Sequence, residues 1–285
     1  MITDFAIKTL RANNLEFSYI EAGQGPLVLL LHGFPDNART WEEIMPQLAS
    51  AGFRAVAIFG RGYFPSEIPS DGNFSVETMA RDVLAAVTAL GYDHAILVGH
   101  DWGASIAYAA ANIDPTKISK LVTLALPHPK ETKTSFKLFW RFRHFLVFQF
   151  GSLAEWYTRR NNFAYIDYLY HYWAPSWKIP QQQIDDVKKD FARPGRLRAA
   201  LQYYHFLLLD NLSARKTALY NRRISVPTLT FIGEEDGALA LGMFDHVAQD
   251  FTGSFTLVTV PHAGHFVHRE QPDVFIKKLL EFLKA

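Results

Sequence analysis

The sequence predicts an α/β fold, in which a mostly parallel central sheet carries helices on both faces and an inserted helical cap. Three observations carry this prediction. Short runs of Val, Leu and Ile end at Gly or Pro, as buried strands of a covered parallel sheet do. Segments with helical spacing of apolar residues separate these runs in a β-α-β-α order. A stretch crowded with aromatic side chains, from about Phe136 to Tyr204, interrupts that order before it resumes.

The predicted strands lie before and after the aromatic stretch. Asn13 and Asn14 divide an alternating apolar and polar segment at residues 5–23, which predicts an antiparallel hairpin at the edge of the sheet. The other strands are expected at residues 27–33, 54–60, 94–100, 120–127, 227–233 and 254–261.

The predicted helices divide between the sheet and the insertion. A helix at 75–91 begins with a capping box at Ser75 with Glu77 and Thr78, and it ends at Gly91. Further helices are expected at 102–113, 136–150, 161–173, 195–211 and 271–284. We assign residues 1–129 and 213–285 to an α/β core, and residues 130–212 to a helical cap. Such a cap would cover the carboxyl ends of the strands, where open α/β sheets bind ligands.

Composition narrows the classes of function. The 285 residues contain 29 Lys and Arg against 28 Asp and Glu, so a net charge of +1 gives no reason to expect a nucleic acid as partner. The chain has no Cys, which excludes disulfides, thiolate metal sites and a Cys nucleophile. No apolar run reaches the ~18 residues of a membrane span, and the first residues do not resemble a signal peptide. We expect a cytoplasmic protein that binds no metal.

The segment Gly99-His100-Asp101-Trp102-Gly103 joins a predicted strand to a predicted helix through a sharp bend. Small residues two positions before and after Asp101 are needed there, because larger side chains would clash with the neighbouring strand and helix. The bend presents Asp101 at the end of the sheet and directs the backbone N–H groups of the helix start toward it. The alternative role for Asp101 is an ordinary helix N-cap.

Two later strand ends supply partners for Asp101. Asp236 follows the strand at 227–233, and His265 follows the strand at 254–261. The order nucleophile, acid, histidine is that of a hydrolase triad, in which His265 would activate water and Asp236 would orient its ring. Neighbouring side chains are alternatives for these two roles, namely Glu234, Glu235, His262 and His268.

A tight turn at His32-Gly33-Phe34 follows the first central strand. The backbone N–H of Phe34 is expected to face the nucleophile as one donor to a developing oxyanion, with the N–H of Trp102 as the second. The side chains of Phe34, Trp102 and Phe266 are also expected against the substrate.

The chain resembles the α/β-hydrolase superfamily, and within it the branch of epoxide hydrolases and haloalkane dehalogenases. The resemblance rests on HGFP (32–35), RGYFPSE (61–67), GHDWG (99–103), GEED (233–236) and AGHF (263–266), which follow one another in the family's order. It implies an α/β-hydrolase fold with a cap, and a triad of Asp101, His265 and Asp236 that needs no cofactor. One departure is Phe64, at a position where Gly is more usual.

A carboxylate in this bend indicates a saturated carbon as the target of attack. Ser in this place attacks acyl carbons, where a carboxylate would form an anhydride. Attack by Asp101 on a carbon that carries a leaving group gives an alkyl-enzyme ester, which water activated by His265 can hydrolyse. Epoxides and alkyl halides both suit this scheme.

The residues of the cap are expected to show which of the two substrate types the protein uses. Opening an epoxide leaves an alkoxide that needs a proton donor, and epoxide hydrolases resembling this chain usually supply two cap tyrosines. Tyr204 matches the second, whereas His144 stands where the first is usual, a pairing that a minority branch uses. The resemblance therefore implies Tyr204 and His144 on the epoxide oxygen. Packing within the cap is the alternative role for both.

Haloalkane dehalogenase activity is the alternative function. Halide release needs N–H donors, which Trp102 and a cap Trp would supply, with Trp140, Trp156, Trp173 and Trp177 as the candidates. An ester or lactone hydrolase is disfavoured by Asp101, and a non-catalytic ligand-binding protein of this fold by the complete triad. We expect a small apolar or aromatic substrate, with water as the second reactant. The sequence leaves a homo-oligomer open.

Overall fold

The structure is a computed structural model that describes residues 5–131, 143–211, 219 and 222–285. Its eight-stranded sheet has the order β1-β2-β4-β3-β5-β6-β7-β8. The first two pairs along this order, β1–β2 and β2–β4, are antiparallel, and all the others are parallel. The strands are β1 (Lys8–Ala12), β2 (Leu15–Ala22), β3 (Leu27–Leu31), β4 (Arg54–Ile58), β5 (Ala95–His100), β6 (Ile118–Leu124), β7 (Thr228–Gly233) and β8 (Phe255–Val260). The predicted α/β fold with a mostly parallel sheet is confirmed.

Helices cover both faces of the sheet. α2 (Val76–Ala89) and α3 (Trp102–Ile113) pack on one face, and α1 (Met45–Ser50) and α11 (Pro272–Lys284) pack on the other. Side chains of β3 alternate between the two cores, since Leu29 joins the first cluster while Val28 and Leu30 join the second. This alternation explains why β3 is apolar along its whole length.

The turn of the edge hairpin and the start of α2 both have the local structure that the sequence predicts. Asn13 and Asn14 take positive φ of 46° and 63° between β1 and β2, as a two-residue hairpin turn requires. The Ser75 hydroxyl oxygen accepts the backbone N–H of Thr78, so it caps α2. The short 3-10 helices are η1 (Ala38–Trp41), η2 (Pro115–Lys117), η3 (Pro129–Glu131), η4 (Leu241–Phe244) and η5 (Val247–Asp250), and α10 (Val267–Glu270) is a short α-helix.

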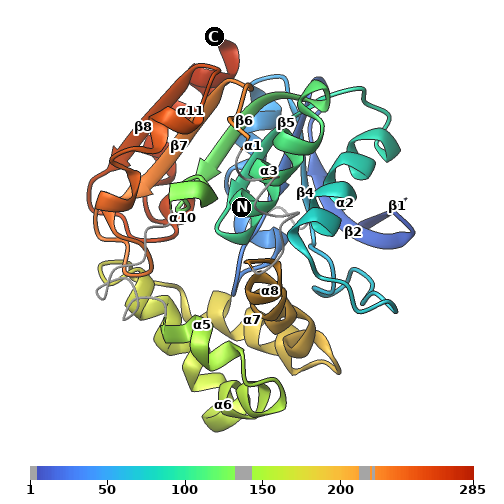
Figure 1. Ribbon diagram of the computed structural model, residues 1–285, viewed down its shortest axis with the longest axis vertical. Coiled ribbons are helices and arrows are strands. Elements are labelled where there is room, and N and C mark those ends of the chain that lie inside the picture. Colours follow the sequence, from blue (N-terminus) through green and yellow to red (C-terminus); the bar gives the residue numbers. More distant parts are fainter. Residues whose placement is uncertain (1–4, 132–142, 212–218, 220–221) are drawn as a thin grey trace.

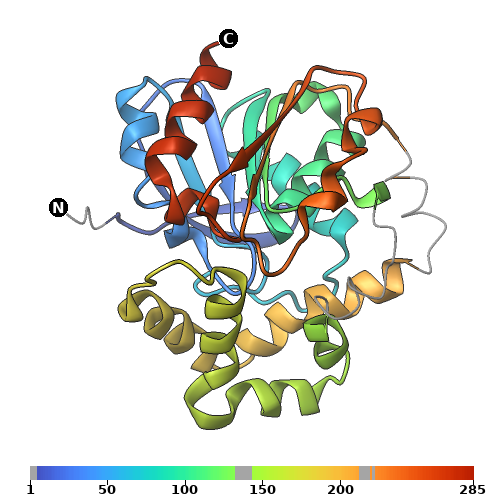
Figure 2. The same cartoon turned by 90° about the vertical axis from the view of Figure 1, so that its left-hand side faces the viewer.

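Four helices form a group below the sheet in Figures 1 and 2, on the side away from the C terminus. They are α5 (Arg143–Phe148), α6 (Ser152–Trp173), α7 (Gln181–Ala192) and α8 (Arg196–Asn211). α6 begins before the helix predicted at 161–173, and it is kinked by non-helical backbone angles from Arg160 to Phe163. The first part of the helix predicted at 136–150, and the predicted cap boundary at residue 212, lie outside the described residues.

The sequence prediction missed α7. Its side chains are mostly Gln, Asp and Lys, and this polar run hides a narrow apolar stripe of Ile184, Val187 and Phe191. Those three positions fall on one side of a helix, and all three side chains are buried. α7 matters for the site because it brings Phe191 to the boundary between cap and core.

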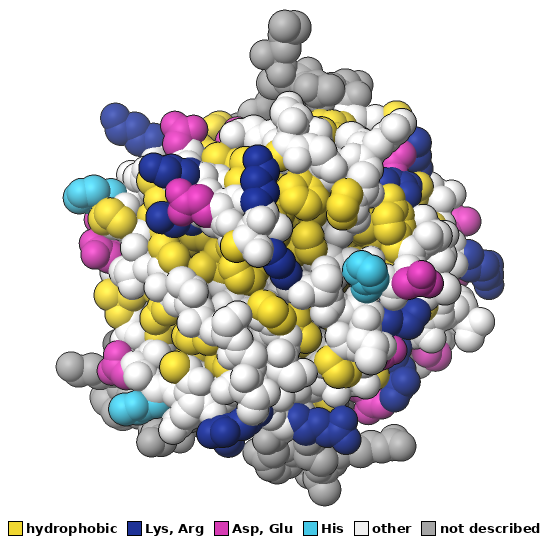
Figure 3. Space-filling view, turned by 90° about the horizontal axis from the view of Figure 1, so that it is seen from above, with side chains coloured by type: hydrophobic (Ala, Val, Ile, Leu, Met, Phe, Trp, Pro, Cys, Tyr) yellow, Lys and Arg dark blue, Asp and Glu magenta, His cyan; other side chains and the backbone are white. Residues whose placement is uncertain are grey.

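The face opposite the cap is shown in Figure 3. Apolar side chains gather on this face, and side chains of both charges lie among and around them, so it carries no field of a single sign. Within the described part of the chain, no helix is long and apolar enough to cross a membrane.

Candidate active site

Asp101 occupies a strained bend between β5 and α3. Its backbone angles are φ 52° and ψ −115°, which a residue with a side chain rarely adopts. The bend requires small neighbours: a Cβ on Gly33 would lie 2.5 Å from the Asp101 Cβ, and one on Gly99 would lie 2.3 Å from the Gly103 carbonyl oxygen. Asp101 is the N-cap residue of α3 by position, but its side chain makes no capping hydrogen bond to the helix.

The two carboxylate oxygens of Asp101 have different partners. Oδ1 accepts the backbone N–H of Phe34 over 2.9 Å. Oδ2 lies 3.6 Å from Nε2 of His265, and the Asp101 side chain is 18% exposed while that of His265 is 1% exposed. The structure thus brings together three of the predicted site residues, which come from the ends of β3, β5 and β8.

Asp236 holds the other side of the histidine ring. Its Oδ2 lies 2.9 Å from Nδ1 of His265, while Oδ1 accepts the backbone N–H groups of Ala238 and Leu239 over 2.7 and 2.9 Å. Both backbone bonds fix the carboxylate, so Nδ1–H of His265 donates to Asp236 and Nε2 faces Asp101.

The neighbouring candidates for these roles lie elsewhere. His262 has an 83% exposed side chain 3.7 Å from Glu235. His268 is fully buried, where Nε2 lies 2.8 Å from the Thr40 hydroxyl and the ring stacks on Trp41. The structure therefore places His265, and neither of these two, beside Asp101.

Backbone groups that sequence reasoning missed fix the loops that carry Asp236 and His265. The carbonyl of Trp173, at the end of α6, accepts the N–H of Gly237 over 3.1 Å and the N–H of His265 over 3.0 Å. Nε2 of His100 lies 2.9 Å from the carbonyl oxygen of His265. The cap thus holds both loops through one carbonyl, and no residue type would signal this because every residue has such a group.

Charge couples Asp101, His265 and Asp236. Burial alone would lower the pKa of His265, but the carboxylates of Asp236 and Asp101 raise it to about 10. Burial alone would raise the pKa of Asp101, yet the His265 ring outweighs it and holds the pKa below its ordinary value. Near neutral pH, Asp101 and His265 therefore form an ion pair.

The predicted oxyanion donors flank Asp101. The N–H of Phe34 already binds the Asp101 carboxylate. Trp102 is the first residue of α3, where backbone N–H groups have no partner within the helix and the helix dipole favours negative charge. Together they can stabilise an oxyanion formed on the Asp101 carboxyl group.

Tyr204 lies close to the two predicted oxyanion donors, and His144 lies close to Tyr204. Tyr204 is 1% exposed, and its ring centre lies 5.1 Å from that of Trp102 and 5.5 Å from that of Phe34. His144 is 4% exposed, with its ring centre 5.9 Å from that of Tyr204. Burial, then the charge of Asp101, raises the pKa of Tyr204 well above its ordinary value, so its hydroxyl stays protonated.

The remaining predicted residues divide between the site and its surroundings. The fully buried Phe266 ring lies edge-on to His265 with ring centres 5.3 Å apart, so it supports the histidine. Trp173 is also buried, 5.1 Å from the His265 ring, whereas Trp156 is 57% exposed and Trp177 packs on Phe266. Trp140 lies outside the described residues. Among the side chains that the structure describes, no group of three His, Cys, Asp or Glu could hold a metal ion.

Comparison with known proteins agrees with the resemblance to the α/β-hydrolase superfamily. The family model described as alpha/beta hydrolase fold matches residues 26–272. The AB hydrolase superfamily protein YfhM of Bacillus subtilis (strain 168) is 27% identical over 282 residues, which cover 96% of each chain. The soluble epoxide hydrolase of Corynebacterium sp. (strain C12) is 27% identical, with 99% of this chain and 98% of that one covered.

A solved structure gives the same result in three dimensions. The crystal structure of an epoxide hydrolase from Vigna radiata has a TM-score of 0.86 and 26% identity, over 100% of this chain and 99% of that one. The family match covers most of the sequence, and the sheet order and the bend at Asp101 agree with it. The chain therefore belongs to the α/β-hydrolase fold family.

Proposed function

We propose that this protein hydrolyses epoxides to diols through an ester formed on Asp101. The observation that carries the proposal is the position of the Asp101 carboxylate, which lies between the N–H of Phe34 and the ring of His265, while the Tyr204 ring packs against the adjacent Trp102. Relatives of this chain bear the name epoxide hydrolase, which supports the same reaction class.

In the first step, Asp101 attacks a carbon of the epoxide. Oδ2 forms the new C–O bond, because Oδ1 is held by Phe34. The bond between that carbon and the epoxide oxygen breaks, and the oxygen takes the proton of the Tyr204 hydroxyl. A ring nitrogen of His144 contacts the same oxygen. The product of this step is a hydroxyalkyl ester of Asp101.

Ester formation prepares His265 for the second step. In the resting protein the ring is cationic because two carboxylates face it. The ester carries no charge, so the pKa of His265 falls when Asp101 is alkylated, and the ring passes a proton toward the Tyr204 oxygen. Neutral Nε2 can then act as a base, while Asp236 keeps the ring in place.

In the second step, water attacks the carbonyl carbon of the ester as His265 takes its proton. The oxyanion forms on Oδ1, where the N–H of Phe34 is already in place. The C–O bond of the ester breaks, and the leaving alkoxide takes the proton from His265. The second proton of the water, left on the new carboxylic acid of Asp101, moves to His265 and restores the resting ion pair.

Carbon–halide hydrolysis is the second candidate. The observation that favours it is the indole N–H of Trp173, which is buried beside His265 and has no hydrogen-bond partner among the described residues. With Trp102 it could bind a leaving halide, although Phe34 contributes no side-chain donor.

The deciding experiment is a turnover panel of epoxides and alkyl halides on the wild type and on Asp101→Asn. Diol formation from epoxides, lost in the variant, is the expected result. Halide release without any diol would overturn the epoxide proposal in favour of the second candidate. Unchanged turnover by freshly prepared Asp101→Asn would remove the mechanism for both.

A further inference from the structure

Gln149 links two helices of the cap. It directly follows α5, which carries His144, and its side-chain amide reaches α8, which carries Tyr204. Nε2 of Gln149 donates to the carbonyl oxygen of Phe145 over 3.1 Å and to that of Tyr204 over 3.0 Å. The NH₂ group of a side-chain amide has two hydrogens, so both bonds can form at once. One amide therefore holds the backbone next to His144 against the backbone of Tyr204.

The bond to Phe145 closes the end of α5. The last four carbonyl groups of a helix have no N–H partner within it, and the carbonyl of Phe145 is one of these four. The backbone N–H of Gln149 donates to the carbonyl oxygen of Leu146, three residues earlier, over 3.1 Å. The Phe145 carbonyl is thus left for the Gln149 side chain, which caps the helix.

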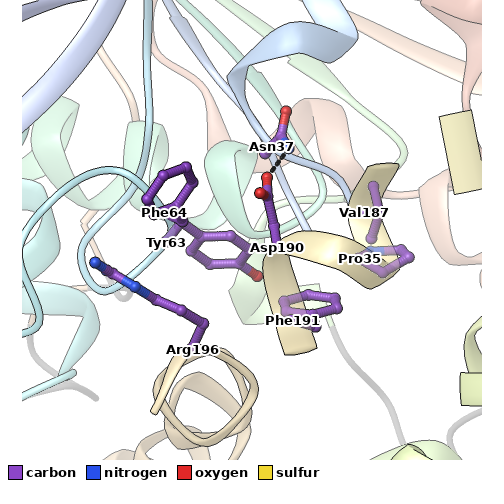
Figure 4. Close-up of a pocket in the computed structure, with 8 residues that line it drawn as sticks. All are labelled: Pro35, Asn37, Tyr63, Phe64, Val187, Asp190, Phe191 and Arg196. Atoms are coloured by element: carbon purple, nitrogen blue, oxygen red, sulfur yellow. Dashed lines mark hydrogen bonds between the residues drawn. The ribbon is translucent and has the colours of Figure 1, made fainter. Parts of the chain in front are cut away.

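The other three helices of the cap have hydrogen bonds to the core. These are made by α6 through the carbonyl of Trp173, by α7 through Asp190, which accepts Nδ2 of Asn37 over 3.0 Å (Figure 4), and by α8 through the Tyr203 hydroxyl, which donates to the carbonyl oxygen of Arg61 over 2.8 Å. The core therefore fixes α8, and Gln149 attaches α5 to α8.

Aromatic rings on α5 surround the Tyr204 ring. The ring centres of Phe148 and Phe145 lie 4.8 and 4.9 Å from that of Tyr204, and the His144 ring lies edge-on at 5.9 Å. All three rings belong to the helix that the Gln149 amide caps. A shift of α5 along α8 would therefore change the separation between His144 and Tyr204.

The acceptor atom of the same amide indicates that stability alone does not explain Gln149. Its Oε1 is buried and has no hydrogen-bond partner among the described residues. The cost of burying such an oxygen offsets much of what the two donated bonds contribute. Met has a side chain of similar length and would avoid this cost. What Met would lose is the fixed position of α5 against α8.

We propose that Gln149 is a positioning residue for the epoxide hydrolysis, whose amide holds His144 and Tyr204 at the separation at which both contact the epoxide oxygen. Gln149 acts through these two side chains and does not touch the substrate. Position matters because a misplacement of about 1 Å can slow a reaction about a hundredfold. This inference rests on the proposed epoxide hydrolase function.

The experiment measures the two steps of the reaction separately in Gln149→Met. Rapid-quench measurements with styrene oxide under single-turnover conditions should show ester formation slowed by about tenfold, as when a hydrogen bond to a developing charge is lost. Ester hydrolysis should be unchanged, because His265 and the N–H of Phe34 carry that step. If Gln149→Met fails to fold, Gln149→Glu takes its place, since a carboxylate keeps the shape of the side chain but cannot donate.

Gln47→Met is the matched control. Nε2 of Gln47 also donates to a carbonyl oxygen four residues earlier, that of Glu43, but at an exposed place on the core. This variant should leave the rates of both steps unchanged.

A double-mutant cycle shows whether Gln149 acts through His144. In the His144→Phe background, Gln149→Met should slow ester formation little further, because the side chain that it positions is already absent. The proposal would be overturned by an undiminished effect in that background, by equal slowing of both steps, or by an unchanged rate of ester formation in the folded Gln149 variant.

A measurement without substrate separates this proposal from the proposed function. Fluorotyrosine replaces the 12 tyrosines, and the fluorine NMR signal of Tyr204 is the one that Tyr204→Phe lacks. Gln149→Met should shift this signal, whereas Gln47→Met should not. If the signal shifts but no epoxide is hydrolysed by the wild type, the proposed function fails and the contact between α5 and α8 stands. If epoxides are hydrolysed and Gln149→Met changes neither the signal nor ester formation, the positioning role fails alone.

Discussion

Nε2 of His265 lies 3.6 Å from Oδ2 of Asp101. This distance is too long for a good hydrogen bond but short enough for a strong interaction between opposite charges in a buried site. The ring is also hydrogen-bonded to Asp236. The two carboxylates together keep a proton on the ring, which makes the charge of Asp101 the variable that decides whether His265 can act as a base.

The resting ion pair should appear in the pH dependence of stability. The pKa of His265 is about 10 in the folded protein and near 6.5 in an unfolded chain, so protonation stabilises the fold. This contribution is complete below about pH 6.5 and is lost as pH rises through about 10, and it amounts to at most about 5 kcal/mol. Urea unfolding of the wild type and of His265→Gln between pH 6 and pH 10, a range of about four units, measures it.

The expected outcome is a difference in unfolding free energy between the two proteins that shrinks as pH rises. A constant difference across this range would contradict a raised pKa. His262→Gln is a matched control, because that exposed ring should not change the slope.

Tyr204→Phe should slow the first step more than the second. The change removes the hydroxyl that we propose as proton donor to the epoxide oxygen but keeps the aromatic packing against Trp102 and Phe34. Loss of a general acid typically costs about 10²–10⁴ in rate. Rapid-quench measurement of ester formation and ester hydrolysis under single-turnover conditions separates the steps. Slowing of ester hydrolysis alone would show that Tyr204 has another role.

His144 has a test of its own. His144→Phe keeps an aromatic ring in the buried position but removes both nitrogen atoms, so ester formation should slow by about tenfold, as for a lost hydrogen bond to a developing charge. His144→Tyr restores a donor and should recover part of the rate. Equal rates of ester formation for His144→Phe and the wild type would assign the ring to packing within the cap.

A buried hydrogen bond between cap and core should contribute measurably to stability. The Tyr170 hydroxyl donates to Oδ1 of Asp36 over 2.8 Å, and the Asp36 carboxylate is buried. Tyr170→Phe leaves that oxygen with one partner fewer, which should lower the free energy of unfolding by about 1–3 kcal/mol. Tyr157→Phe, at a 40% exposed position of the same helix, should change it by less than about 0.5 kcal/mol. Equal values for the two variants would show that the Asp36 contact contributes nothing.

The core and the three candidate triad residues could be predicted because they depend on regular features. Buried parallel strands are apolar along their length, and the parallel arrangement brings their carboxyl ends to one edge. Asp101, Asp236 and His265 each follow such a strand, so the pattern of strands was sufficient to place them near one another.

Other parts of the site leave no comparable signal. The carbonyl of Trp173 holds the loops of Asp236 and His265, but any residue could supply it. α7 was missed because its apolar stripe is narrow, and with it the contact between Phe191 and Phe34. Phe64 was visible as a departure from the family, yet its contact with Arg193 depends on the docking of the cap.

The nucleophilic role of Asp101 is tested most directly by the mass of the protein after reaction with an epoxide. His265→Gln removes the base for the second step, so the ester should accumulate when this variant is mixed with styrene oxide. We predict a mass increase of one substrate molecule, located by peptide mapping on the peptide that contains Asp101 and absent from the Asp101→Asn, His265→Gln double variant. Epoxide consumption without this adduct, or with the adduct on another residue, would contradict the account.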